Sequence, residues 1–512
     1  MKNLIHRQPP RAALGLTAAS LLIAVAGCAP QAADEAGTLE TASAVLEEIP
    51  FTTDSEAARA LFDDGQYLLD VGRGVEAREK FQAAIAEDPA FVRAHIGQSN
   101  ASLSFQEFQE CLDAASEHLE STSDAEKLMV EINQTFLTND TERGVQLATQ
   151  LAGQYPNSAR AAILLAGLQG GQNDNAGARV SFEKALALDP NSAGALYGAA
   201  NSYLFGEPKD FAIAEQFAQQ AIAAYPDEAK GHELMGDIHR AQNDLDAALA
   251  SYDQVSELDP TMPNGHHKRG HVNSFLGNIE EARAAYDAGV AAARPENKAG
   301  LAVYKTFTRI HEGNVPAALD ELEALAGEIE AMGTPAHQVK GLKIFALNSL
   351  ATAALHAGLL ERAAMAVATG NELRMAIADD VGTEDAQRLQ TVACHQWDGL
   401  LAAYGGDTTG AAEHADAMGS LVEGDDNPRK MEGAHYVLGM SALEAGDHDA
   451  AAEHLGQANH ANNMFIRYQL ALAEDALGNS EQAKKLFAEV GSYNFNSVGF
   501  ALVGKDARKR AG

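Results

Sequence analysis

ARAAILLAGLQGGQNDNAGARVSFEKALALDP, residues 159–190, is the first of three consecutive copies of one sequence pattern. The copies close at Pro190, Pro226 and Pro260, which lie 36 and 34 residues apart. A small residue recurs in the first half of each copy and an alanine in the second half: Ala166, Ala200 and Gly236, then Ala178, Ala214 and Ala248. A period near 34 with these features is typical of stacked helix pairs. The stretch therefore predicts a helical solenoid.

Packing accounts for this spacing. A short helix pair does not bury its apolar stripes alone, so successive pairs stack and share one continuous core. Small residues such as Ala166 and Gly270 are expected to let the two helices of a pair approach closely. Aromatic residues such as Tyr252 and Tyr286 are expected to fill the space between pairs. The closing prolines end the second helix, because proline has no amide donor and clashes with the preceding turn.

The pattern resembles the tetratricopeptide repeat (TPR), most clearly in YPDEAKGHELMGDIHRAQNDLDAALASYDQVSELDP, residues 225–260. Similar units begin near Phe51. Beyond Pro295 a glycine turn followed by an alanine recurs at spacings of 45, 48, 40 and 32 residues, which indicates longer helices or irregular connections. We predict an all-α fold, a right-handed α-solenoid of about eleven TPR-like helix pairs that is irregular in its C-terminal half.

The sequence pattern divides the chain into five segments. They are a lipoprotein signal peptide (1–27), an acidic flexible tether (28–50), an N-terminal TPR solenoid (51–295), a C-terminal divergent TPR-like solenoid (296–490) and a capping tail (491–512). The apolar residues of the tail are expected to cover the last helix pair. Together with the closing YNFNSVGFALV, this order resembles long bacterial TPR lipoproteins of undefined activity.

The N-terminus carries the second strong signal. A basic start is followed by the apolar run Ala12–Ala26, which is short for a permanent membrane span. The run ends in Val-Ala-Gly-Cys at Cys28, which resembles a bacterial lipobox. That resemblance implies lipidation of Cys28, whereas an ordinary secretory signal with a chance cysteine is the alternative. Ala29 replaces the aspartate associated with inner-membrane retention, so we expect an outer-membrane anchor facing the periplasm.

The charge of the chain argues against nucleic acid as a partner. The formal net charge is −35, and cleavage before Cys28 removes three basic residues and no acidic one, which takes it to −38. Phosphate backbones require neutralisation by Lys and Arg, so this surface disfavours them. Beyond Cys28 the only cysteines are Cys111 and Cys394, which we expect to be buried free thiols.

A histidine cluster is the densest polar feature. His267 and His271 lie four residues apart, on one helix face, a spacing that suits a metal ion. No HExxH motif or acidic third ligand is evident within that helix. We therefore interpret the cluster as part of a partner-binding surface, with surface histidines and a metal site as the alternatives. No nucleophile, base and orienting group come together in the sequence, so we expect neither an enzyme nor a cofactor.

The predicted partner site is the concave groove of the solenoid. Its candidate residues are polar in the first half and more aromatic in the second, where packing against adjacent helices is the alternative. They are Arg160, Tyr197, Asn201, Lys230, Glu233, Asp237, Arg240, Asn264, His267, His271, Tyr436 and Tyr468.

Three functions follow from these patterns. The first is a membrane-anchored scaffold that binds proteins or peptides, in cell-envelope assembly, secretion or transport. The second is a carbohydrate-binding uptake lipoprotein, which the single tryptophan, Trp397, disfavours because sugar platforms usually need several aromatic rings. The third is metal binding through His267 and His271.

Overall fold

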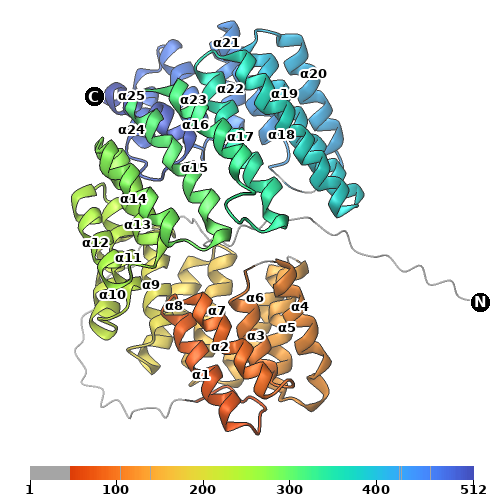
Figure 1. Ribbon diagram of the computed structural model, residues 1–512, viewed down its shortest axis with the longest axis vertical. Coiled ribbons are helices and arrows are strands. Elements are labelled where there is room, and N and C mark those ends of the chain that lie inside the picture. Colours follow the sequence, from red (N-terminus) through yellow and green to blue (C-terminus); the bar gives the residue numbers. More distant parts are fainter. Residues whose placement is uncertain (1–46, 104, 139, 426, 428, 462) are drawn as a thin grey trace, which may run out of the picture. The chain divides into compact units, whose positions relative to one another are not determined.

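The computed structural model describes residues 47–512 except 104, 139, 426, 428 and 462. Across these residues the chain forms 25 α-helices and one short 3-10 helix, Leu119–Ser121, and no strand (Figure 1). The predicted all-α fold of helix pairs is confirmed. In chain order the helices make twelve pairs and a last single helix. The signal peptide, Cys28 and the tether up to residue 46 lie outside the described residues.

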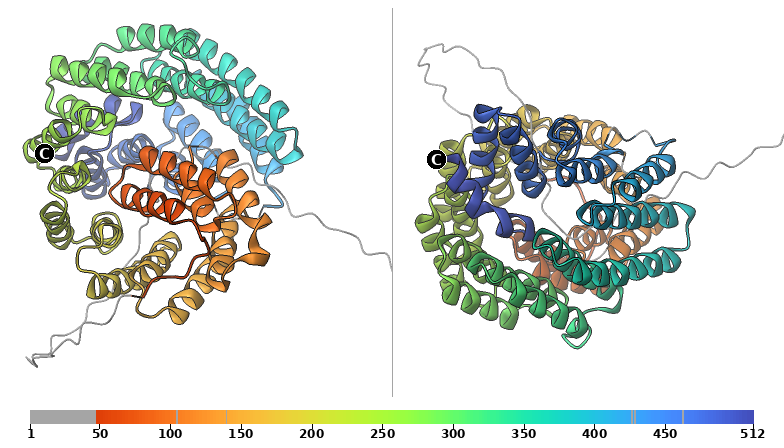
Figure 2. Two further views of the ribbon diagram at one scale, coloured as in Figure 1. Left: turned by 60° about the horizontal axis from the view of Figure 1, so that its bottom comes forward. Right: turned by 90° about the horizontal axis from the view of Figure 1, so that it is seen from above.

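Two compact units make up the described chain, and the division falls between Gln242 and Asn243. We call residues 47–242 the N-terminal unit. Its helices lie side by side in a curved row (Figure 2). They are α1 (Glu56–Asp70), α2 (Gly74–Glu87), α3 (Val92–Asn100), α4 (Phe105–Glu117), α5 (Asp124–Thr138), α6 (Thr141–Gln154), α7 (Ala159–Gly171), α8 (Asn175–Leu188), α9 (Ala193–Leu204), α10 (Phe211–Ala224) and α11 (Ala229–Ala241).

Residues 243–512 form the C-terminal unit, within which the sequence pattern changes near residue 295. Its helices are α12 (Leu245–Leu258), α13 (Pro263–Leu276), α14 (Ile279–Ala292), α15 (Pro295–Glu312), α16 (Val315–Glu328), α17 (Ala336–His356), α18 (Leu360–Val381), α19 (Glu384–Tyr404), α20 (Thr408–Leu421), α21 (Glu432–Ala445), α22 (His448–Gln457), α23 (Met464–Ala476), α24 (Ser480–Gly491) and α25 (Val498–Ala511).

Helix length explains the irregular repeat spacing. Helices α15, α17, α18 and α19 have 18, 21, 22 and 21 residues, whereas α1–α14 have 9 to 15. The predicted lengthening beyond residue 295 is therefore present. It is confined to these four helices, because α20–α25 return to 10 to 14 residues.

Aspartates fix where many second helices begin. In each case the side chain caps the helix by accepting a hydrogen bond from the amide three residues later, which satisfies a donor that the helix leaves unpaired. The capping residues are Asp140, Asp174, Asp210, Asp244, Asp407 and Asp447. The short turns before these helices thus have a local chemical cause in the sequence.

Small residues and buried rings interlock both within one helix pair and between neighbouring pairs. A Cβ placed on Gly270 would lie 2.7 Å from the Tyr286 ring, and one on Gly198 would lie 2.3 Å from the Phe182 ring. Tyr286 is fully buried. These contacts leave no space for a methyl group, so the glycines set how closely neighbouring helices approach.

We expect Gly198→Ala to destabilise the N-terminal unit by about 1–3 kcal/mol, because the new methyl group must displace Phe182. Gly167 is the matched control, since a Cβ there meets nothing within 4 Å. Gly167→Ala is expected to stabilise helix α7 by up to about 1 kcal/mol. Thermal and urea unfolding of the two variants would measure both effects, and equal behaviour would contradict this packing account.

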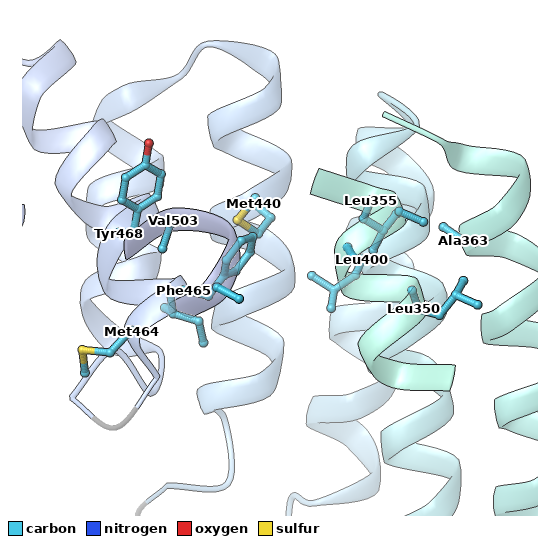
Figure 3. Packing of buried hydrophobic residues seen from close by; sticks show 14 of the residues in the cluster. Leu350, Leu355, Ala363, Leu400, Met440, Met464, Phe465, Tyr468 and Val503 are labelled. Atoms are coloured by element: carbon cyan, nitrogen blue, oxygen red, sulfur yellow. The ribbon is translucent and has the colours of Figure 1, made fainter. Parts of the chain in front are cut away.

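The last helix belongs to the core of the C-terminal unit. The largest apolar cluster of this unit runs from Ala299 to Ala507. Val503 of α25 lies beside Phe465 and Tyr468 of α23 in this cluster (Figure 3). Helix α25 packs on α24 and also contacts α15, α17 and α23. It therefore covers the end of the helix row and also reaches helices far back in the sequence.

Candidate functional site

In the N-terminal unit, residues of α1 and of the turn after it contact two of the predicted groove residues, Arg160 and Tyr197. Arg160 at the start of α7 pairs with Asp70 at the end of α1, with an Nη1–Oδ1 distance of 2.8 Å. Tyr67 donates a hydrogen bond of 3.0 Å to Glu228. Val71, in the turn after α1, is 1% exposed and shares an apolar cluster with Tyr197. The α1–α2 turn therefore covers part of the predicted partner face.

The other polar candidates of this unit form short-range pairs. Lys230 Nζ lies 2.9 Å from Glu233, and this carboxylate raises the pKa of Lys230. Arg240 Nη2 lies 3.0 Å from Asp237. Glu233 and Arg240 are buried. Asn201 is half-buried.

In the C-terminal unit, His271 lies beneath the tail. Its Nδ1 is 2.5 Å from the Tyr286 hydroxyl, and Asn496 Nδ2 lies 3.2 Å from the same nitrogen. The ring of His267 stands 4.1 Å from that of His271, centroid to centroid. Among the described residues no group of three or more His, Cys, Asp or Glu side chains is placed to hold a metal ion. Within this part of the chain, no third side chain joins His267 and His271 to complete a metal site.

The remaining candidates of this unit differ in accessibility. Tyr468 is 6% exposed, and its hydroxyl donates a hydrogen bond of 2.6 Å to Asp506 of α25. Tyr436 is half-buried, and burial raises its pKa. Asn264 is exposed. Within this unit the candidates therefore differ in how accessible they are, and their role in partner binding stays a prediction.

Two non-helical segments of the chain lie on the helices of the repeats. In the N-terminal unit, residues 47–53 contact α3 and α5 through Ile49, Thr52 and their neighbours. In the C-terminal unit, residues 492–497 bring Asn496 onto α13, α14 and α15. The chain therefore supplies its own occupants for surfaces that the repeat pattern assigns to partners.

Sequence reasoning missed two histidine pairs. His395 and His414 face each other with an Nδ1–Nδ1 distance of 3.0 Å, and His435 and His454 do the same at 3.0 Å. The signal was present, because each pair spans 19 residues and the second pair follows the first after 40. Each pair joins the two helices of one repeat through a contact between Nδ1 atoms at hydrogen-bond distance.

The two described cysteines are free, as expected. Cys111 is buried and Cys394 half-buried. Burial raises the pKa of Cys111 to about 11 and raises that of Cys394. Both are therefore thiols at neutral pH and poor nucleophiles.

Comparisons with known proteins concern the repeats. Residues 236–274 match the family model described as TPR repeat. No curated protein matches the chain.

Solved structures with related folds are distant in sequence. A chain in the crystal structure of the APC/C hetero-tetramer Cut9–Hcn1 is 15% identical to this one. The match covers 91% of this chain and 78% of that chain, with a TM-score of 0.42. A tetratricopeptide repeat protein from Parabacteroides merdae is 15% identical over 56% and 98%, with a TM-score of 0.32. YrrB, described as a TPR protein with an unusual peptide-binding site, is 21% identical over 35% and 91%, with a TM-score of 0.28.

The repeat-model match falls on the stretch in which the sequence period is most regular, and helix pairs with interlocking small and aromatic residues continue to both sides of it. These two findings agree independently of the distant structures. Residues 236–274 therefore carry a tetratricopeptide repeat, and the described chain on both sides of it is built of helix pairs.

Proposed function

We propose that this chain is a lipid-anchored scaffold of the bacterial cell envelope that binds other proteins. The observation that supports the proposal is the placement of two non-helical segments on the helices of the repeats. Residues 47–53 lie on α3 and α5, and Asn496 of residues 492–497 contacts α13, α14 and α15. A surface that holds a non-helical segment of its own chain through hydrogen bonds has groups that can hold a peptide segment of a partner.

The lipobox resemblance at Cys28 supplies the proposed location. Two or three acyl chains on one cysteine give stable anchoring, whereas a single chain gives marginal binding. In residues 47–512, as far as they are described, no helix combines the length and apolar character needed to cross a bilayer. We assign the anchor to the outer membrane, facing the periplasm, on the basis of Ala29.

Carbohydrate binding is the weaker alternative. Trp397 is the single tryptophan, and it is half-buried with the Arg374 guanidinium 5.7 Å from its ring centroid. Sugar platforms present open aromatic faces, whereas the Arg374 guanidinium already lies over this half-buried ring. Recovery of glycan rather than protein with the full chain purified from cells would overturn the scaffold proposal.

The anchor is tested by metabolic labelling with a fatty acid. Wild-type protein is expected to incorporate the label and Cys28→Ser to incorporate none, because the thiol is the acceptor of the diacylglyceryl group. Cys111→Ser is the control and should label like the wild type, since Cys111 is a buried thiol. Equal labelling of the wild type and Cys28→Ser would contradict the proposed lipid anchor.

A further inference from the structure

Residues 47–53, Glu-Glu-Ile-Pro-Phe-Thr-Thr, cross α3 and α5 without forming a helix. The backbone of this segment is held along its length. Glu47 N donates to Asn157 O at 3.2 Å, and Arg93 Nη1 donates to Ile49 O at 3.3 Å. Ser123 Oγ donates to Pro50 O at 3.3 Å. Contacts to successive backbone groups are the means by which extended peptides are recognised.

Two side chains of the segment insert into apolar surroundings. Ile49 is 4% exposed and belongs to the cluster that contains Val92, Ile96 and Met129. The Phe51 ring packs between Phe62 and Phe91, at centroid distances of 6.0 and 5.7 Å. Pro50, between these two anchors, is exposed, and so is Glu48, which precedes Ile49 and pairs with the exposed Arg59. The segment thus presents alternate side chains to the helices, as an extended ligand does.

Two buried charges hold this segment. Glu126 is 0% exposed, and it accepts hydrogen bonds from Thr52 N at 3.1 Å and Thr52 Oγ1 at 2.8 Å. It also caps α5 by accepting from Ser123 N at 3.1 Å. Arg93 is 7% exposed, and burial lowers its pKa to about 10.

Burying a charge is costly unless hydrogen bonds satisfy it. A segment that merely filled apolar space would need no such groups. Arg93 and Glu126 therefore provide polar recognition of a backbone carbonyl and of a threonine.

We propose that the face formed by α3, the start of α5 and the turn before α7 is a binding site for an extended peptide. The ligand of this site is a partner segment with a branched aliphatic residue, proline, an aromatic residue and threonine in that order. Residues 47–53 occupy the site in cis and must leave before the partner enters. The inference rests on the proposed scaffold function and names the partner chemistry of one surface.

Residues 47–53 compete with a free peptide for the site and so determine the apparent affinity of that peptide. Because only Asp54 and Ser55 separate residues 47–53 from α1, their effective concentration at the site is on the order of mM. A free peptide with micromolar intrinsic affinity is then largely excluded from the wild-type chain. Opening the site should raise its apparent affinity at least tenfold.

The test uses a fluorescein-labelled peptide with the sequence of residues 45–54, VLEEIPFTTD, and fluorescence anisotropy. Ile49→Asp in the full chain is expected to open the site, since a carboxylate does not remain among apolar side chains. This variant should bind the peptide at least tenfold more tightly than the wild type. A peptide with aspartate in place of its isoleucine should bind neither protein.

Matched variants identify the face. In the Ile49→Asp background, Arg93→Gln is expected to lower peptide affinity at least fivefold. Lys127→Gln should leave the affinity unchanged, because Lys127 is a half-buried residue of α5 that pairs with the exposed Asp124. A chain that begins at Asp54 is a second open form, in which added peptide should raise the thermal unfolding temperature.

Absence of peptide binding in both open forms would overturn the proposal, whether or not they fold without the peptide. A dimer that crosslinks residues 47–53 of one copy to α5 of another would show that the occupant is a second copy and would also overturn it. Protein partners retained in cells by a chain that binds no peptide would leave the scaffold function standing and remove this site alone.

Discussion

Phe500→Ala is expected to lower the unfolding free energy of the C-terminal unit by about 3–5 kcal/mol, the range for removal of a buried aromatic ring. Phe500 is 1% exposed. Its ring meets Phe275 of α13 edge to face at 5.4 Å and Tyr493 at 5.9 Å. The substitution removes buried contacts between α25 and a helix more than 200 residues earlier, and little nearby is free to refill the cavity.

Trp397 makes this prediction measurable in one unit, because the single tryptophan lies in α19 of the C-terminal unit. Its fluorescence during urea unfolding reports that unit alone. Met365→Ala is the matched control, since Met365 of α18 is 66% exposed, and it should change the free energy by less than about 0.5 kcal/mol. Similar losses in the two variants would show that the tail is not part of the core.

Acidification is expected to destabilise the same unit. Burial, with a smaller contribution from Arg508, lowers the pKa of His311 to about 4, although a hydrogen bond to Asn496 opposes the shift. The unfolded chain binds the proton at the ordinary value near 6.5. The folded chain therefore has its full stability above pH 6.5 and loses it as the pH falls toward 4. At about 1.4 kcal/mol per pKa unit, the loss attributable to His311 is up to roughly 3 kcal/mol.

Comparison of wild type with His311→Gln isolates this histidine from others whose pKa values burial also lowers, such as His95 and His356. Urea unfolding at pH 7.0, 5.5 and 4.5 should give a shallower pH dependence for His311→Gln. His337→Gln, at an exposed position, should retain the wild-type slope. Identical slopes for all three proteins would contradict the assignment.

The repeat architecture was readable from sequence because its determinants are local. Gly270 and Tyr286 lie 16 residues apart and interlock through the geometry of one helix pair. Aspartates such as Asp244 mark helix starts within a few residues. The lengthened helices α17–α19 left their trace in the glycine spacing. Each of these features depends on a short stretch of chain.

The packing of non-helical segments onto helices of the same unit could not be predicted from local sequence patterns. Ile49 lies in a stretch that is acidic and turn-prone, and nothing local distinguishes it from a tether. Asn496 meets His271 at a sequence separation of 225 residues. The position of a tail over a solenoid depends on small rotations summed over many repeats. The periodicity of one sequence does not determine the total of these rotations.

The histidine pairs are a different case. His395 and His435 recur at the 40-residue step that the glycine turns already showed, and their partners follow at the same step. Aligning these two repeats residue by residue would have revealed them. An i, i+4 spacing indicates histidines on one face of a single helix, whereas the members of these pairs lie on two different helices.

We propose that this chain acts by binding proteins through the faces of its repeats. Site-specific photo-crosslinking in living cells tests it most directly, with a benzophenone amino acid placed at Asn201, Asn264 or Tyr436. Val180 of α8, which is 66% exposed and outside the predicted face, is the control position. We predict light-dependent protein adducts of defined mass from at least one of the three positions and none from Val180. Absence of protein adducts at all three, or the same adducts from Val180, would contradict the claim.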